Sequence, residues 1–591
     1  MANFYTDNED IQFLFEYMDV ARLAEIIEEG FGFHQEFDFA PENAADAVDN
    51  YQRILTVTGQ IAAEDVAPTA EETDKVGNTL NQDGSVTYAP GIANALKRLA
   101  QADLMGFTLP YRYGGINCPN LVYTMSNEIV SRADAALMNL YGLQGIAETI
   151  NAFASEDIKQ QYLPRMAGGE WTGAMVLTEP DAGSDLQSVK VRAYQDDQGN
   201  WYVHGVKRFI TNGCGEVLLV LARTEPQIAD GRGLSLLLVE RGPLVKIRRL
   251  EEKLGIHGSP TCEIFFDNSP AKLIGERQRG LITYVMSLMN GARVGIAAQS
   301  IGIAEAAYRV AREYAHTRRQ FDTAVENFPA VRELLVNMHV DLQAARALAY
   351  YTGFCVDLEN GALRKLESDQ AARNKDLKKS LKQDSRAYGR FTKLLTPISK
   401  YYASEMSIRV SNDAVAVLGG SGYMKDYAAQ RHLRDSRITT IYEGTSQLQV
   451  IAAVAGVVRG TARAIADKLL AGPSKPAEAE AAWPKDLHPL IEQVRGGLVL
   501  LDDAVAFIKA QPGSTHRDLY ARKLVDMATY LIIAALLCDQ AAASRTREPL
   551  ARRWITWRMP EVRMLKETIC CGDTQIVDDF ETLAGPVPVV E

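Results

Sequence analysis

The sequence predicts an α+β protein that is mainly helical and contains one small β-domain. Three observations lead to this expectation. At 591 residues the chain is too long for a single hydrophobic core. Apolar side chains recur at helical spacing over most of the chain, and strand-like patterns are confined to residues 173–285. A Pro/Ala-rich stretch at 472–480 reads as a linker to a further helical domain.

The chain begins with an N-terminal extension, residues 1–45, in which aromatic and acidic side chains surround a short helical pattern at 21–27. Disordered tails contain few aromatics, so we expect this extension to pack onto the body of the protein. Residues 46–172 form the expected N-terminal helical domain. Its clearest helical spacing is that of Ile92, Ala95, Leu96, Leu99 and Ala100.

The β-domain is expected at residues 173–285. Segments 189–194 and 201–204 flank the polar turn 196–200 and predict a hairpin. Further strands are expected at 216–222, 234–240 and 263–266, and turns at Pro270 and Gly275 are expected to close the domain.

Helices are expected to resume after Leu281 and to form a catalytic helical bundle over 286–460, interrupted by a charged segment at 364–393. An additional C-terminal helical domain is expected over 461–591, with two long amphipathic helices at 487–510 and 518–543.

The composition is that of an ordinary globular protein, with 47% hydrophobic and 23% charged residues. A formal net charge of −12 argues against a nucleic-acid partner. The acidic N-terminus does not resemble a signal peptide, and the longest apolar stretch, 527–538, is shorter than the ~20 residues that cross a bilayer. We therefore expect a cytoplasmic protein that is not integral to a membrane.

Seven cysteines are scattered along the chain and show no Cys-x-x-Cys spacing. This pattern indicates a reducing compartment and predicts no disulfide framework and no metal site.

One carboxylate lies on a glycine-flanked turn after a helical segment: Glu443, within the run Ile-Tyr-Glu-Gly-Thr-Ser-Gln at 441–447. Taken alone it would be read as a solvated surface residue. Three upstream motifs change this reading: Leu-Thr-Glu-Pro-Asp-Ala-Gly-Ser-Asp at 177–185, Gly-Val-Lys-Arg-Phe-Ile-Thr-Asn-Gly at 205–213, and Arg-Arg-Gln-Phe at 318–321.

These four motifs, in this order and at these separations, resemble the acyl-CoA dehydrogenase family over roughly residues 50–455. The extension, the 364–393 insertion and the terminal domain resemble its long subgroup, which includes 3-methylmercaptopropionyl-CoA dehydrogenase. The phrase at 395–400, Leu-Thr-Pro-Ile-Ser-Lys, supports this subgroup. The resemblance implies a helical domain, a barrel-like β-domain and a helical bundle, with flavin between the last two.

The resemblance makes Glu443 the catalytic base, which takes the α proton of an acyl-CoA thioester. A free Glu with a pKa of ~4.3 is a weak base, so burial against flavin and thioester is expected to raise its pKa. No side chain accepts the β hydride, so a redox cofactor is required. Because the chain has no Gly-x-Gly-x-x-Gly motif at a strand-to-helix junction, FAD is expected rather than a nicotinamide.

The resemblance also assigns binding residues. The loop carrying Thr178 and Ser184 would face the flavin ring edge and the pyrophosphate, and Phe209 and Thr211 would stack on and hydrogen-bond the ring. Arg318 and Phe321 would reach the flavin of a neighbouring subunit, and the loop with Gly419 and Gly420 would pack on the adenosine half across the dimer interface. Thr445 and Gln447 complete the expected FAD contacts; Arg293, Tyr442 and Gly444 are the expected substrate contacts.

Many family members carry Trp at the position of Phe209, Gly at that of Asp322 and Gln at that of Ala416. The expected function is α,β-dehydrogenation of an acyl-CoA to a trans-2-enoyl-CoA, with electrons passing to an electron-transfer flavoprotein, in a homodimer or a dimer of dimers. Two alternatives are an acyl-CoA oxidase that uses dioxygen and a catalytically silent CoA-binding assembly protein.

Overall fold

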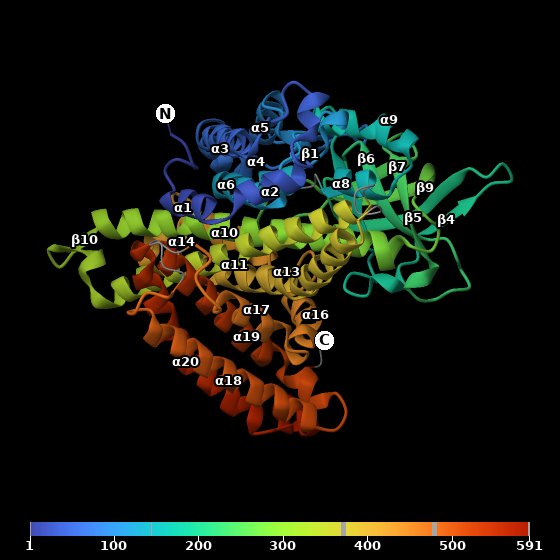
Figure 1. Cartoon of the computed structure of the whole chain (residues 1–591). Helices are drawn as coiled ribbons and strands as arrows, with labels where there is room; N and C mark the ends of the chain where they lie inside the picture. Colours follow the sequence, from blue (N-terminus) through green and yellow to red (C-terminus); the bar gives the residue numbers. More distant parts are fainter. Residues whose placement is uncertain (1, 143–144, 368–373, 476–481, 589–591) are drawn as a thin grey trace. The chain divides into compact units, whose positions relative to one another are not determined.

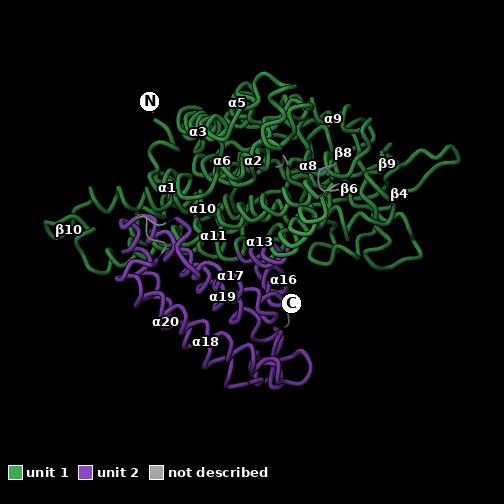
Figure 2. The backbone as a smooth tube through the Cα atoms, in the orientation of Figure 1, with its two compact units in different colours: residues 1–388, 399–445 green, residues 389–398, 446–591 purple. Residues whose placement is uncertain are grey.

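The computed structural model describes residues 2–142, 145–367, 374–475 and 482–588. The chain forms two compact units, drawn in different colours in Figure 2. The first comprises residues 1–388 and 399–445, and the second comprises 389–398 and 446–591. The second unit therefore begins earlier than the expected boundary at 461. Parts of the expected linker at 472–480 and of the 364–393 insertion lie outside the described residues.

The N-terminal part of the first unit is helical, as the sequence predicts (Figure 1). Asn43 caps α3 by accepting the backbone N–H groups of Ala45 and Asp46, and Asp134 caps α7 in the same way. The predicted positions Ile92, Ala95 and Leu99 are buried on α5. The helices are α1 Glu9–Tyr17, α2 Val20–Ile27, α3 Ala44–Ile61, α4 Ala70–Val76, α5 Pro90–Gln101, α6 Asn120–Ala133, α7 Ala135–Tyr141, α8 Gly145–Phe153 and α9 Glu156–Ala167.

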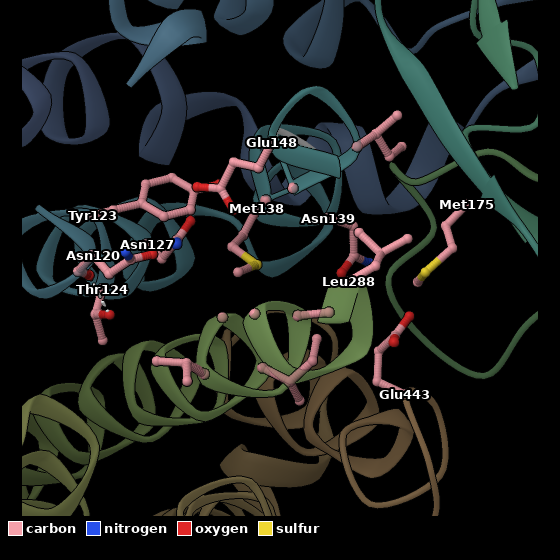
Figure 3. A pocket seen from close by; sticks show the side chains of 18 of the residues that line it. Asn120, Tyr123, Thr124, Asn127, Met138, Asn139, Glu148, Met175, Leu288 and Glu443 are labelled. Atoms are coloured by element: carbon pink, nitrogen blue, oxygen red, sulfur yellow. Dashed lines mark hydrogen bonds between the residues drawn. The ribbon is translucent and has the colours of Figure 1, made fainter. Parts of the chain in front are cut away.

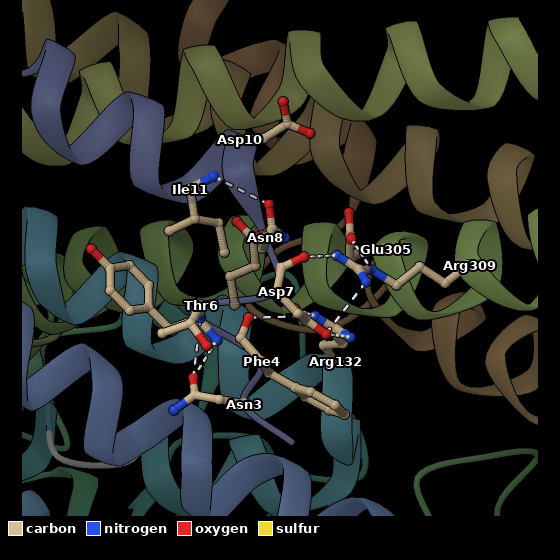
Figure 4. Close-up of polar contacts among 12 residues, drawn as sticks. Asn3, Phe4, Thr6, Asp7, Asn8, Asp10, Ile11, Arg132, Glu305 and Arg309 are labelled. Atoms are coloured by element: carbon tan, nitrogen blue, oxygen red, sulfur yellow. Dashed lines mark hydrogen bonds and ion pairs between the residues drawn. The ribbon is translucent and has the colours of Figure 1, made fainter. Parts of the chain in front are cut away.

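The N-terminal extension packs onto this helical part, as expected. The rings of Phe33, Phe37 and Phe39 lie with their centroids 5.9, 5.7 and 5.4 Å from that of Tyr111. Figure 4 shows a second anchor, in which Arg132 donates to both carboxylate oxygens of Asp7 at 2.6 and 2.7 Å. Aromatic contacts and a bidentate ion pair thus fix the start of the chain.

The β-domain contains a closed ring of five strands. β4 (Arg192–Gln195) pairs antiparallel with β5 (Trp201–Thr211), and the ring continues through β9 (Thr261–Ile274), β7 (Leu234–Glu240) and β6 (Val217–Arg223) back to β4. Two further strands lie beside the ring: β3 (Gly173–Val176) pairs parallel with β6, and β8 (Val245–Leu250) pairs with β9. The predicted hairpin is confirmed, with Tyr194 opposite Tyr202.

Three details of the β prediction are wrong. β4 begins at Arg192 rather than 189, and Pro270 lies inside β9 instead of closing the domain, opposite Tyr202 of β5. β3 and β8 are missing from the prediction. β3 is only four residues long, and β8 places basic side chains at exposed positions, so neither has a long apolar signature.

Long helices complete the first unit. They are α10 Met286–Thr317, α11 Pro329–Glu367 and, apart from residues 389–398, α13 Lys375–Leu418, followed by the short α14 Gly420–Tyr423 and α15 Ala429–Ile438. Two small hairpins also belong to this unit: β1 Thr79–Leu80 with β2 Val86–Thr87, and β10 Arg319–Gln320 with β11 Thr323–Ala324. The described part of the predicted charged interruption is helical from Lys375 onward. A Cβ at Gly302 would lie 2.5 Å from the carbonyl oxygen of Glu128, so glycine allows α10 to approach α6 closely.

The second unit is helical among its described residues. Its helices are α16 Ser446–Val458, α17 Thr461–Leu469, α18 His488–Ala510, α19 Thr515–Ala543, α20 Glu548–Cys570, α21 Gln575–Asp578 and α22 Phe580–Ala584. α18 and α19 confirm the two long helices expected there.

Within the described residues, two helical segments are long and apolar enough to cross a membrane: Gly280–Thr317 and Thr515–Ala543. The bent pair Ser446–Val458 and Thr461–Leu469 would add a third if it formed one span. Inside the protein, 89% of the apolar window of Thr515–Ala543 is buried, and 44% of that of Gly280–Thr317. The apolar helix is longer than the expected stretch at 527–538, but its burial agrees with the expectation of a bundle helix.

Candidate active site

A cavity lies within the first unit, between α6, α7 and α8, the strands β3 and β5, and the long helices α10 and α11. Together with the solvent at its mouth it measures about 910 Å³. Figure 3 shows Glu443 at one end, near Met175 of β3, and residues of α6 at the other. Met138, Leu288 and Ile146 give its middle part an apolar wall.

Glu443 is placed by the turn that follows α15. The backbone N–H of Tyr442 donates to the carbonyl of Ile438 at 3.1 Å. Glu443 then adopts φ 55° and Gly444 φ 86°, both in the left-handed region. This pair of residues turns the chain sharply and directs the carboxylate into the cavity. The glycine that flanks the predicted base is therefore required by the backbone.

Burial dominates the electrostatics of Glu443 and raises the pKa of its carboxyl to about 7. The charges of Lys400 and Arg293 oppose this rise. Lys400 is fully buried, and its Nζ donates to the carbonyl of Gly444 at 2.8 Å. Burial, with the charge of Arg293, lowers the pKa of Lys400 to about 7, although Glu443 acts in the other direction. Lys400 thus holds the turn and sets the charge beside the carboxylate.

Arg293 is buried on α10, where its Nη1 donates to Asn290 at 3.1 Å. Its Nε has no hydrogen-bond partner among the described residues. Burial lowers the pKa of Arg293, and the carboxylate of Glu443 opposes this shift. The residue is therefore near the base, but it is not among the side chains that line the cavity, and its contact with substrate stays a prediction.

Tyr442 fixes the other side of the turn. Its hydroxyl lies 3.0 Å from Oδ1 of Asn139 and also donates to Gln299. Gln299 in turn donates to Asn139 at 2.9 Å. These side-chain amides come from α7 and α10, so two separate helices hold the residue before Glu443, and the Tyr442 side chain lines the cavity.

The loop after β3, which carries Thr178 and Ser184, is held by a buried ion pair. Nζ of Lys207 lies 2.9 Å from the carboxylate of Glu179 and donates to the carbonyl of Leu177 at 2.7 Å. Glu179 also accepts the backbone N–H groups of Lys190 and Val191 at 2.6 and 2.9 Å. The loop backbone is thereby fixed on both sides, while Thr178 is only partly buried and Ser184 is exposed.

The surface next to this loop suits an isoalloxazine ring. Phe209 adopts φ 61° and leaves 53% of its surface exposed, which is unusual for a large aromatic side chain. Two residues further along β5, Thr211 lines the cavity that contains Glu443. An exposed aromatic ring, side-chain hydroxyls and the Glu443 carboxylate thus occur around one site, and this set of groups fits a flavin.

Comparison with known proteins supports this interpretation. The models for the N-terminal, middle and C-terminal domains of acyl-CoA dehydrogenases match residues 49–170, 174–269, and 279–375 with 376–458. An acyl-CoA dehydrogenase of Bacillus subtilis is 33% identical over 396 residues, which cover 66% of this chain and 92% of that protein. The chain belongs to the acyl-CoA dehydrogenase family.

The 3-methylmercaptopropionyl-CoA dehydrogenase of Ruegeria pomeroyi is 31% identical over 436 residues, covering 68% of this chain and 69% of that protein. The solved acyl-CoA dehydrogenase complexed with FAD from Bacillus anthracis has the same fold, with a TM-score of 0.73 at 21% identity over 92% of both chains. Acyl-CoA dehydrogenases are flavin-dependent oxidoreductases that use FAD, and this chain has the same class and cofactor.

Other site residues predicted from the family resemblance lie outside the cavity. Arg318 is exposed at the end of α10, and Phe321 is 90% exposed at φ 51° in the adjoining hairpin. Gly419, which follows α13, and Gly420, the first residue of α14, are exposed, with no atom within 4 Å of the Cβ that either would carry. Thr445 is partly buried, and Gln447 is an exposed residue of the second unit.

Several residues of the site were not predicted from the sequence. Lys400 was noted only within a subgroup signature, and Glu179 and Lys207 only as members of motifs. Glu148 and Asn127, which line the cavity, did not appear at all. Charged or amide side chains in helical segments usually belong to a solvated face, so spacing alone gave no reason to select them. No cluster of three or more metal-binding side chains occurs among the residues that the structure describes.

Proposed function

We propose that this acyl-CoA dehydrogenase family member oxidises an acyl-CoA thioester to the trans-2-enoyl-CoA, with Glu443 as the base. The observation that carries the proposal is the position of Glu443 at one end of a cavity with an apolar wall, with its pKa raised to about 7. A base of that pKa is largely ionised just above neutrality yet basic enough to assist removal of a carbon-bound proton.

FAD, when bound, supplies the acceptor for the β hydride, which no protein side chain can provide. Thr178, Ser184, Phe209 and Thr211 are the residues of this chain proposed to hold it. The residues of the turn have separate tasks. Tyr442 and Lys400 keep the turn in place, Glu443 accepts the α proton, and the backbone N–H of Glu443 is proposed to bind the thioester oxygen as charge develops there.

The test is a Glu443→Gln variant, which keeps the side-chain shape and removes the base. Under anaerobic conditions, addition of acyl-CoA should bleach the flavin absorbance of the wild type. The variant should bind FAD and bleach slower by about 10²–10⁴-fold, the usual contribution of a general base. Glu313→Gln, on the same unit but exposed on α10, is the matched control and should bleach normally. Bleaching of Glu443→Gln at the wild-type rate would refute the role of Glu443.

Electrons are proposed to pass from the reduced cofactor to an electron-transfer flavoprotein, as the family resemblance implies. Measurement of hydrogen peroxide in air distinguishes this route from an oxidase reaction. With an artificial electron acceptor present, the wild-type protein should form little hydrogen peroxide per turnover. Peroxide should appear only when dioxygen is the sole acceptor. Peroxide formed in proportion to enoyl-CoA at full rate would instead assign dioxygen as the acceptor.

A homodimer is proposed from the exposure of the predicted flavin-binding residues outside the cavity. Phe321, Gly419 and Gly420 present open surface away from any packed core of their own subunit, and the backbone of Phe321 and Gly419 has a positive φ. A second copy of the chain would place its flavin against such a surface and bury it.

A further inference from the structure

The cavity that begins at Glu443 ends in a polar cluster. Figure 3 places Tyr123 and Asn127 of α6 and Glu148 of α8 at the end farthest from Glu443. Between them and the base lie Met138 and Leu288. A pocket made for a plain alkyl chain would end in apolar side chains, because a buried polar group without a partner costs free energy.

Asn127 is the least satisfied member of this cluster. It is 1% exposed, and neither its amide nitrogen nor its amide oxygen has a hydrogen-bond partner among the described residues. Burial raises the pKa of Tyr123, and the nearby Asn127 amide opposes this rise. The Asn127 amide and the Tyr123 hydroxyl nevertheless lack the geometry of a hydrogen bond. One strong donor and one strong acceptor therefore remain available at the end of the cavity.

Glu148 provides the second available group. One carboxyl oxygen accepts a hydrogen bond from Thr108, and the other faces Gly291 across the cavity, 4.0 Å from the position of a Cβ there. Burial raises the pKa of Glu148, and the charge of Asp357 acts in the same direction. The neighbours that act on this carboxyl include no cation, so the neutral acid is favoured.

Other polar groups around this end of the cavity already have partners. The Tyr123 hydroxyl donates to the carbonyl of Tyr141 at 3.1 Å, and the Asn120 amide donates to Asp357 at 3.0 Å. Asn139 donates to Ser259 at 3.0 Å and accepts from Gln299. Asn127 and Glu148 are thus the pair in this cluster with unused hydrogen-bonding capacity toward the cavity.

We propose that the acyl chain of the substrate ends in an uncharged polar group, a hydroxyl or a carboxamide, that hydrogen-bonds Asn127 and Glu148. This inference rests on the proposed function, because it treats the cavity as the acyl pocket of the dehydrogenase. A methyl end would leave the Asn127 amide unpaired, and a carboxylate end would be buried near the charge of Asp357 with no cation among the groups that act on Glu148. A hydroxyl or carboxamide both donates and accepts, which matches the two available side chains.

The test measures binding separately from turnover. Glu443→Gln protein loaded with FAD is titrated with acyl-CoA thioesters of matched chain length that end in methyl, hydroxyl, carboxamide, carboxylate or ammonium groups. Perturbation of the flavin absorbance reports the dissociation constant. The hydroxyl or carboxamide thioester should bind about 10- to 100-fold more tightly than the methyl one, the range expected when a buried polar group gains or loses its partner.

Asn127→Leu, added to Glu443→Gln, should remove this preference, and Asn151→Leu on α8, outside the cavity lining, should keep it. Asn127→Leu should also raise the melting temperature, because it removes two unpaired polar atoms from the interior. A lower melting temperature would show that the amide serves a structural partner and would overturn the proposal. Equal or tighter binding of methyl, carboxylate or ammonium thioesters would overturn it as well.

The two proposals fail in different ways. If wild-type protein bleaches with methyl-ended thioesters best and Glu443→Gln shows no preference, the dehydrogenase function stands and the polar substrate class is wrong. If no thioester bleaches the flavin but Glu443→Gln keeps the Asn127-dependent preference, the polar site stands and the dehydrogenase function is wrong.

Discussion

At the scale of single residues, burial and charge act in opposite directions on Glu443. Burial raises the pKa of its carboxyl, whereas the charges of Lys400 and Arg293 lower it, and the outcome is about 7. Without these two cations the carboxyl would hold its proton further into the alkaline range. Lys400 also binds the carbonyl of Gly444, so one side chain affects both the position and the basicity of the base.

The pH dependence of the reaction follows from this balance. The proposed base, Glu443, must be ionised to accept a proton, so kcat/KM should rise with pH and level off above an apparent pKa of about 7. Lys400→Met removes a positive charge that favours the ionised carboxyl. The rising part of the profile of kcat/KM against pH should therefore move to higher pH, by about one pH unit. The measurement is kcat/KM against pH for both proteins.

Lys400→Arg is the control for this prediction, because it keeps a charge and a donor at the same place. The rising part of its pH profile should stay closer to that of the wild type. A Lys400→Met profile that falls in amplitude but keeps its midpoint would show that Lys400 only positions the turn.

Glu443 could be predicted from the sequence because its turn needs a glycine neighbour and because four motifs occur in a fixed order. Lys400 could not, since its burial depends on how α13 packs against the turn, and the sequence around it gives no sign of that contact. Asn127 was hidden for the same reason: its unpaired amide is visible only when the walls of the cavity are in place.

At the scale of elements, the loop after β3 depends on one buried ion pair. Lys207 is fully buried and Glu179 almost fully, and the carboxylate also binds the start of the chain leading into β4. The pair therefore links β3, β5 and the approach to β4 around the loop proposed to contact FAD.

Lys207→Met should lower the free energy of unfolding of this domain by about 3–5 kcal/mol, because it leaves the Glu179 carboxylate buried without its cation. It should also weaken FAD binding, which a titration of apoprotein with FAD would measure. Lys190→Met is the matched control: Lys190 pairs with Asp181 at 3.6 Å, and both side chains are largely exposed. An equal effect of the two substitutions would contradict the role of the buried pair.

The strands were predictable where the chain alternates or is continuously apolar, as in β4, β5, β6 and β7. The position of β9 was predictable but its length was not: the strand runs from Thr261 to Ile274, through Pro270. Proline usually ends a strand, yet Pro270 lacks only an N–H, and the pairing with β5 continues on both sides of it.

At the scale of the whole molecule, the proposed flavin site draws residues from two copies of the chain. Complementation tests this directly. An Arg318→Ala protein lacks the phosphate contact proposed to be given to its partner, and a Glu443→Gln protein lacks its own base. In a mixed dimer one site would combine an intact base with an intact Arg318 from the other subunit. Mixing the two impaired proteins after dissociation should therefore restore activity.

Arg319→Ala mixed with Glu443→Gln is the control, because the Arg319 guanidinium donates within its own hairpin to the carbonyl of Asp322 at 2.7 Å. Arg319→Ala alone should retain activity, so mixing should add nothing to it. No recovery in the Arg318→Ala mixture, with mixed dimers demonstrated by mass, would show that Arg318 serves the flavin of its own subunit.

The left-handed backbone of Glu443 bears on how this protein can change through inheritance. At φ 55° any residue with a Cβ is strained by about 1–2 kcal/mol, and glycine is not. A glutamate codon becomes a glycine codon by a single nucleotide exchange. At this position such an exchange would relax the main chain and discard the carboxylate together, so descendants without the reaction could persist as well-folded proteins.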